Sequence, residues 1–129
     1  MSYKDLNVYQ RAYKVAIDLH HTIEDQPKLV PSMRQPLETL SRGVLANIAE
    51  SFAQRTVKAK RFFNFKARDM IRAIQMDLDF LHDLKLIPQK AYELFYSEYE
   101  ICSKQLYKLN ESILENQDSK RTEKVAVAA

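Results

Sequence analysis

The feature of this sequence that most restricts its fold is the near absence of glycine. One glycine, Gly43, occurs in 129 residues. The tight turns that connect β-strands usually need residues that accept a positive φ angle, and glycine accepts it most easily. The chain is therefore expected to be all-α. Its 46% hydrophobic and 29% charged residues are typical of a single globular domain.

Four stretches with helical periodicity follow one another along the chain. In each, apolar residues recur every three or four positions, which collects them on one helix face. We predict helices from about residue 5 to 25, from a cap at Ser32 to about 53, from 57 to 86 after a cap at Thr56, and from 88 to 114. Short connections favour an up-down-up-down antiparallel four-helix bundle over residues 1–115. The polar, aperiodic residues 116–129 are predicted to be a disordered tail.

The periodicity also assigns faces to the helices. The inward face predicted for the first helix consists of Leu6, Tyr9, Tyr13, Ala16, His20 and Ile23. The outer side of the second helix carries the small residues Ala46, Ala49 and Ala53, which favour close approach of another helix or subunit. Four tyrosines line one flank of the fourth helix: Tyr92, Tyr96, Tyr99 and Tyr107. Because tyrosine combines apolar area with a polar tip, this flank is typical of an interface.

Positive charge is concentrated between Arg55 and Arg72. This segment contains seven Lys and Arg residues and a single acid, Asp69, so that it carries +6. The whole chain carries a net charge of +3, and the remainder therefore carries about −3. The positive charge is thus a property of one segment and not of the whole protein.

This segment is a candidate surface for RNA or DNA. The predicted phosphate contacts are Arg55, Lys58, Arg61, Lys66, Arg68 and Arg72. Lys and Arg on one surface attract a polyanion regardless of base sequence, and such binding depends strongly on salt. The alternative is an ordinary solvated helix face. Phe65 lies among the cations and could stack on an unpaired base, although we favour burial between subunits for this ring.

Polar residues of the second helix have a structural interpretation. Asn47 lies at the edge of the apolar face, and Glu50 lies further round the helix. Together with Arg42 or Arg55 they could form a polar network across helices or subunits. Such a network sets register and specificity more than stability.

No catalytic, cofactor-binding or metal-binding residue is predicted. The lone Cys102 is expected to face the core, where a thiol behaves as a small hydrophobe. The spacing Asp-x-x-His occurs at Asp18 and at Asp79, but both aspartates lie outside the apolar stripes. A di-metal bundle enzyme would need inward-facing ligands. The single cysteine, the lack of a signal-peptide pattern and the lack of an apolar run of about 20 residues favour a cytoplasmic protein without a membrane span.

Two runs of the sequence resemble a known family. Residues 3–12 read YKDLNVYQRA, and residues 41–50 in the second helix read SRGVLANIAE. Both are similar to four-helix-bundle proteins encoded in 23S rRNA intervening sequences, which are similar in turn to the accessory variability proteins of diversity-generating retroelements. The resemblance covers roughly residues 3–115. The family's glycine after Glu50 is Ser51 here, and the bulkier Met70 departs from the family's small-residue pattern in the third helix.

The resemblance implies a homopentameric, barrel-like assembly that is not an enzyme. For the retroelement branch it further implies nucleic-acid binding through a positive surface and partnership with a reverse transcriptase. For the rRNA-intervening branch it implies no established biochemical role. The alternative is a structural or protein-interaction bundle that does not bind nucleic acid and whose exposed tyrosines and alanines contact protein partners.

Overall fold

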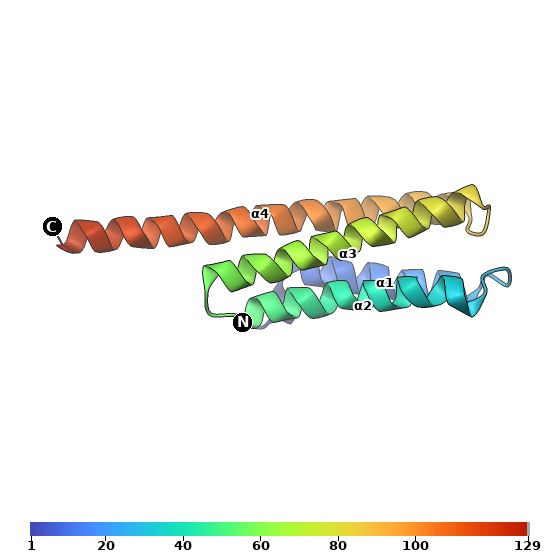
Figure 1. Cartoon of the computed structure of the whole chain (residues 1–129), viewed down its shortest axis with the longest axis horizontal. Coiled ribbons are helices and arrows are strands. Elements are labelled where there is room, and N and C mark those ends of the chain that lie inside the picture. Colours follow the sequence, from blue (N-terminus) through green and yellow to red (C-terminus); the bar gives the residue numbers. More distant parts are fainter. Residues whose placement is uncertain (129) are drawn as a thin grey trace.

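The computed structural model consists of one short 3-10 helix and four long α-helices (Figure 1). Their bounds are η1 Tyr3–Asp5, α1 Asn7–Glu24, α2 Pro31–Ala53, α3 Val57–Asp83 and α4 Gln89–Ala128. The structure describes the backbone of residues 1–128 and the side chains of residues 1–117. No strand occurs in the described backbone, which confirms the all-α prediction. No helix in this part of the chain has the length and apolar character that crossing a membrane requires.

The four long helices form an up-down-up-down bundle. Helices that are consecutive in the sequence pack against each other, and α1 also packs against α4. Among the described residues, the diagonal pairs, α1 with α3 and α2 with α4, make no comparable contact. The result is the predicted four-cornered arrangement, in which the chain reverses direction at each connection (Figure 1).

The core is formed by one buried stripe from each helix. The buried residues of α1 are Val8, Ala12, Val15, Ala16, Leu19 and Ile23. Of the predicted inward residues, Ala16 and Ile23 are buried, and Leu6 and Tyr9 pack against the core. The prediction was wrong for Tyr13 and His20, which are exposed, because the residues one position before them occupy the core instead. The predicted and the observed stripe both have helical spacing, so periodicity alone could not separate them. Aliphatic side chains fill the core, whereas tyrosine and histidine keep their polar atoms near water.

Hydrogen bonds of side chains stabilise the connection from α2 to α3. The Thr56 hydroxyl accepts a hydrogen bond from the Ala59 backbone N–H at 3.1 Å, as predicted for the cap of α3. The Lys60 ammonium group donates to the backbone oxygen of Phe52 at 3.0 Å, and the Ser51 hydroxyl donates to that of Lys60 at 2.7 Å. Lys60 therefore satisfies the C-terminal end of α2 and has a structural role.

The start of α2 differs from the prediction. This helix begins at Pro31 after Val30, which provides no side-chain cap, so the capping role predicted for Ser32 was wrong. A proline at the first helical position needs no cap for its own nitrogen because it has no N–H group. Pro36 lies inside the helix, beyond its first turn.

The single glycine lies at a close contact between α2 and α3. A Cβ atom built on Gly43 would lie 2.6 Å from the sulfur of Met70. The Asn47 side-chain amide donates to the Gly43 backbone oxygen at 2.8 Å and contacts the Met70 sulfur at 3.3 Å. Glycine here makes room for the large Met70 side chain.

The fourth helix is longer than predicted. We expected it to end near residue 114, but its backbone continues as helix to Ala128 and projects past the other three helices (Figure 1). No glycine or proline follows Pro88 in the sequence, so no helix-breaking residue ends it earlier. The disorder predicted for residues 116–129 falls, from residue 118 onwards, outside the described side chains.

Candidate nucleic-acid interface

The N-terminal half of α3 and the residue just before it carry a cationic surface. We call the six residues predicted to contact nucleic acid the basic surface: Arg55, Lys58, Arg61, Lys66, Arg68 and Arg72. Four of them are exposed, whereas Arg61 and Arg68 are half-buried. The opposite face of α3 is buried in the bundle and includes Ala67 and Ile71. The core contacts of α3 therefore turn this cationic side towards solvent.

Most of this charge is not neutralised by carboxylates of the same chain. Arg72 pairs with Asp69 at 3.2 Å, and both side chains are 70% exposed, so the pair contributes little to stability. Arg68 donates instead to the Ser103 hydroxyl at 3.2 Å. Within the described side chains, no other residue of the basic surface forms an ion pair.

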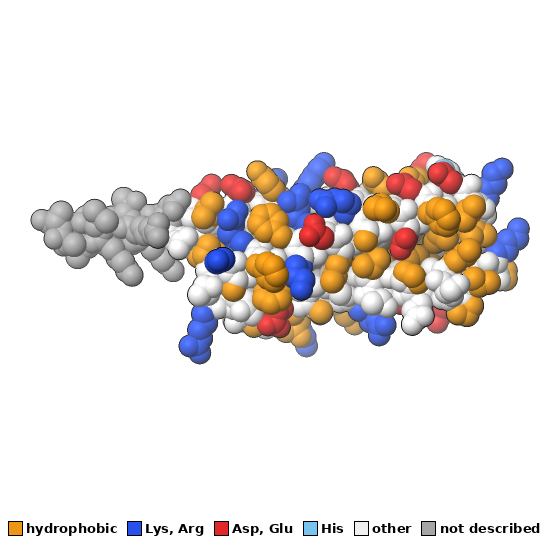
Figure 2. All heavy atoms as spheres, in the orientation of Figure 1, with side chains coloured by type: hydrophobic (Ala, Val, Ile, Leu, Met, Phe, Trp, Pro, Cys, Tyr) orange, Lys and Arg blue, Asp and Glu red, His pale blue; other side chains and the backbone are white. Residues whose placement is uncertain are grey.

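Three exposed aromatic rings lie within the basic surface. Phe62, Phe65 and Tyr107 are 54%, 43% and 51% exposed. Lys66 lies 5.4 Å from the ring centre of Phe62, Arg61 lies 5.5 Å from that of Phe65, and Arg68 lies 5.4 Å from that of Tyr107. These distances are typical of cation–π contacts. In Figure 2, hydrophobic side chains are interspersed with cationic ones over the half of this face nearer the C-terminal extension.

The residues predicted to form a subunit interface lie in different places. Ala46 and Ala53 are exposed on α2, and Ala49 is half-buried. Phe65 is exposed, as described above. On α4, Tyr92 and Tyr96 are half-buried, but the predicted exposed flank was wrong for Tyr99, which is fully buried. Tyr99 lies on the same helix face as the buried Phe95 and Leu106, because its offsets from them, four and seven residues, correspond to whole helical turns. The assignment of the others to an interface stays a prediction.

The predicted polar network does not form within one chain. Asn47 bonds to Gly43 and Met70, as described above. Arg42 donates to the backbone oxygen of Glu38 at 3.2 Å, and Glu50 accepts from the Gln54 amide at 2.8 Å. Arg42 and Glu50 thus bond within their own helix, whereas Asn47 also reaches Met70 of α3, and none of the three bonds to another. A link between subunits stays a prediction.

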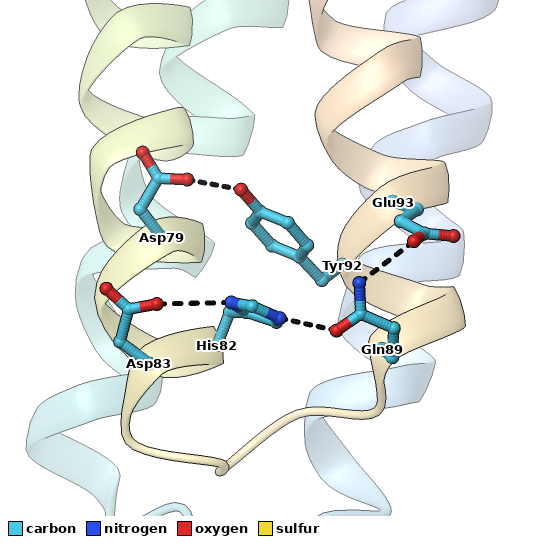
Figure 3. Close-up of polar contacts among 6 residues, drawn as sticks. All are labelled: Asp79, His82, Asp83, Gln89, Tyr92 and Glu93. Carbon is cyan, nitrogen blue, oxygen red and sulfur yellow. Dashed lines mark hydrogen bonds and ion pairs between the residues drawn. The ribbon is translucent and has the colours of Figure 1, made fainter.

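Sequence reasoning missed a cluster of polar side chains where α3 meets α4. We call it the polar joint (Figure 3); it consists of Asp79, His82, Asp83, Gln89, Tyr92 and Glu93. The Tyr92 hydroxyl donates to Asp79 at 2.5 Å, which raises the pKa of Tyr92 to about 12. The Tyr92 ring stacks on the His82 ring with 4.2 Å between centroids. The Asp79-x-x-His82 spacing was the available sequence signal, but it does not indicate the α4 partners.

The His82 imidazole lies between two acceptors. Its Nδ1 lies 3.2 Å from the Asp83 carboxylate, and its Nε2 lies 2.5 Å from the Gln89 amide oxygen. The Gln89 amide nitrogen donates to Glu93 at 2.8 Å, which keeps the amide oxygen directed at His82. The bond to Gln89, together with the one to Asp83, raises the pKa of His82. The described residues contain no group of three or more His, Cys, Asp or Glu side chains that could hold a metal ion.

The buried cysteine and the two grooves on the bundle surface lie outside the basic surface. Cys102 is buried, as predicted, and burial raises the pKa of its thiol to about 12, which keeps it protonated at neutral pH. A groove of about 570 Å³ between α1 and α4 is crossed by the ion pair of Arg11 with Glu98 at 2.6 Å. A second groove of about 400 Å³ lies between α1 and α2, and Leu19 and Leu37 are among the apolar residues that line it.

Comparison with known proteins gives one positive finding. A family model described as 23S rRNA-intervening sequence protein matches residues 4–108. This range includes the whole basic surface and the polar joint. No curated protein and no solved structure matches the chain.

Proposed function

The chain belongs to the family of 23S rRNA-intervening sequence proteins, and on that premise we propose that it is a non-enzymatic protein that binds RNA or DNA through the basic surface. The observation that carries the proposal is the largely unneutralised positive charge on one side of α3. A polyanion that contacts this side releases counterions, which favours binding without any recognition of base sequence.

The proposed contacts are to the nucleic-acid backbone. The six residues are all Lys or Arg, whose side chains bind phosphate oxygens. The basic surface contains no Asn or Gln, the residues that most often read adenine edges. We therefore propose binding that depends on charge and salt and that discriminates little between base sequences.

We further propose that the protein acts as a homo-oligomer. The resemblance to retroelement accessory proteins suggests five copies and, as a partner, a reverse transcriptase. Several copies of one basic surface in a ring would raise the local positive potential and so strengthen binding to a long polyanion.

The proposal is tested by removing charge from the basic surface. Replacing Lys58, Arg61, Arg68 and Arg72 together by Gln should abolish the gel shift of a labelled RNA at low salt. Replacing any one of the four residues by Gln should leave measurable binding and reduce the slope of log K against log salt by about one unit, since each phosphate contact contributes about one unit. Circular dichroism and the hydrodynamic radius of the variant should remain unchanged.

A control variant removes the same charge elsewhere. It replaces four exposed lysines outside the basic surface: Lys4, Lys14, Lys28 and Lys90. The control should retain most of the binding. If both variants lose binding equally, the net charge of the protein, and not this surface, is responsible for nucleic-acid binding. Retained binding in the first variant would show that the site is assigned to the wrong residues.

A protein-interaction bundle is the second candidate. It is favoured by the C-terminal end of α3, where Met76 and Phe80 in the helix and Leu84 at its C-cap are exposed beyond the basic surface. Exposed apolar side chains along one helix face are typical of a protein contact. The absence of co-purified nucleic acid, seen as an ordinary 260/280 nm absorbance ratio, together with no gel shift would favour this candidate.

A further inference from the structure

We infer that the ligand of the basic surface is single-stranded nucleic acid, and that Phe62, Phe65 and Tyr107 stack on its unpaired bases. This inference rests on the proposed function and adds the class of ligand. It starts from the three exposed rings and not from the charge, because charge alone attracts single strands and duplexes alike.

The position of the rings is the first argument. Phe62 and Phe65 lie three residues apart on α3, about 4.5 Å along the helix axis, within the stretch that contains Arg61 and Lys66. Tyr107 belongs to α4 but reaches the same surface, because Arg68 of α3 lies over its ring. Two neighbouring helices thus place aromatic rings on one cationic surface.

The exposure of the rings is the second argument. Each ring is about half exposed, so a cation on one side leaves ring area open to solvent. Phe62 meets the neighbouring Phe63 ring edge-on, with 5.3 Å between centroids, but the three exposed rings make no ring–ring contact with one another. Their exposed apolar area would be stabilised by contact with a ligand that removes it from water. The open ring area is suited to a flat partner.

The chemistry of the ligand is the third argument. A duplex presents phosphates to a protein surface and keeps the faces of its bases stacked on one another. A single strand offers base faces as well as phosphates, and any base can stack on an aromatic ring. Each of the three rings has a Lys or Arg within 5.5 Å of its centre, so that a base on the ring would bring its phosphate close to a cation.

A second copy of the chain is a weaker candidate for covering these rings. A symmetric contact through them would place two basic surfaces against each other, and the like charges would repel. Single-stranded nucleic acid instead supplies negative charge together with flat apolar groups. The exposed Phe80 follows Asp77 and Asp79 in the sequence and makes no cation–π contact within the described side chains, so it lacks this combination.

The test compares binding of a labelled 20-nucleotide oligo(dT) with binding of a 20-base-pair duplex, measured by fluorescence anisotropy at equal salt. The unaltered protein should bind the single strand at least tenfold more tightly. Phe62→Leu, Phe65→Leu and Tyr107→Leu, which keep apolar volume but remove the ring, should each weaken single-strand binding roughly 5- to 150-fold. Their duplex binding should change less than twofold. Phe80→Leu, at a ring that is 61% exposed outside the basic surface, is the matched control and should change neither affinity.

A spectroscopic test reports stacking directly. The chain contains no tryptophan, so Phe65→Trp provides a single tryptophan, whose fluorescence can be excited separately from that of the tyrosines, in the middle of the surface. Oligo(dT) should quench its emission, whereas the duplex should leave it nearly unchanged. Phe80→Trp in an otherwise unaltered chain should respond to neither ligand.

The outcomes separate this inference from the proposed function. If single-strand and duplex binding are equal, or if the three leucine variants bind the single strand normally, the rings do not stack and only the inference fails. A change in oligomer mass in those variants would assign the rings to a subunit contact and would also overturn it. If neither ligand binds at low salt, the proposed function itself fails.

Discussion

Gly43 lies where the backbone of α2 meets the thioether of Met70. Glycine usually weakens a helix by about 1 kcal/mol relative to alanine, because the unfolded chain has more conformations to lose. Here the missing Cβ leaves space for Met70, whose sulfur would lie 2.6 Å from an added methyl group. The side chain of Asn47 contacts both residues and holds them together. The local cost of the glycine is therefore offset by packing between two helices.

We expect Gly43→Ala to change the free energy of unfolding by less than about 1 kcal/mol, because the gain in helix propensity opposes the crowding of Met70. In a Met70→Ala background the same substitution should stabilise the protein by about 1 kcal/mol, since the space is then free. Urea unfolding of the four proteins measures this coupling. If the two substitutions change the free energy of unfolding additively, the contact between Gly43 and Met70 does not couple the two positions.

At the scale of helices, the polar joint connects the end of α3 to the start of α4. His82 lies in the last turn of α3, where a positive charge is also favoured by the helix dipole. The carboxylates around its imidazole belong to Asp79 and Asp83 on α3, and Glu93 of α4 lies behind Gln89. An imidazolium ion donates to both of its acceptors, whereas the neutral ring has only one N–H group. The protonated form therefore fits this joint better.

We expect the contribution of His82 to stability to depend on pH. Because its pKa is raised in the folded protein, the contribution is complete below about pH 6.5 and is lost as the pH rises through the higher folded-state pKa. The difference in denaturation midpoint between the unaltered protein and His82→Gln should thus shrink between pH 5.5 and 8.5. NMR titration of His82 should give a pKa above 6.5. The exposed His21 provides the control, and a His21→Gln difference with the same pH profile would contradict a role for the joint.

At the scale of the whole molecule, the bundle has features that a second copy could use. The outer side of α2 carries Ala46 and Ala53, which are exposed and small enough for another helix to approach closely. An isolated bundle gains nothing from small residues on a solvated face, where charged residues are usual. The outer side of α2 is therefore the part of the surface best suited to contact between subunits.

We expect light scattering to give a mass several times that of the 15.1 kDa chain, and five times if the resemblance holds for assembly. Replacing Ala46 and Ala53 together by Glu should lower this mass, since charge would be buried at the contact, while changing helicity little. Ser97→Glu, at an exposed position of α4, should leave the mass unchanged. A monomeric unaltered protein at micromolar concentration would rule out the proposed assembly.

The placement of side chains could be predicted only in part. Cys102 in the core and Thr56 at the start of α3 were predicted, because each depends on the position of one residue within one helix. The inward face of α1 was predicted only in part: Ala16 and Ile23 are buried as expected, but Tyr13 and His20 are exposed, since two neighbouring stripes of that helix have the same spacing. The candidate basic surface was predicted from the charge of one continuous segment. Of its exposed rings only Phe65 was recognised. Tyr107 belongs to another helix, and the exposure of Phe62 depends on how α3 packs against its neighbours.

The sequence alone determined that the protein is an all-α bundle of four helices with positive charge on the third. These properties follow from glycine content, periodicity and local charge, which act within one segment at a time. Only the tertiary structure decided that Gly43 faces Met70, that Arg68 contacts Ser103 and Tyr107, and that His82 meets Gln89. Each of these contacts joins residues of different helices. Helix periodicity gives the direction of a side chain around the axis of its own helix. It does not give the rotation of that helix relative to the neighbouring helices.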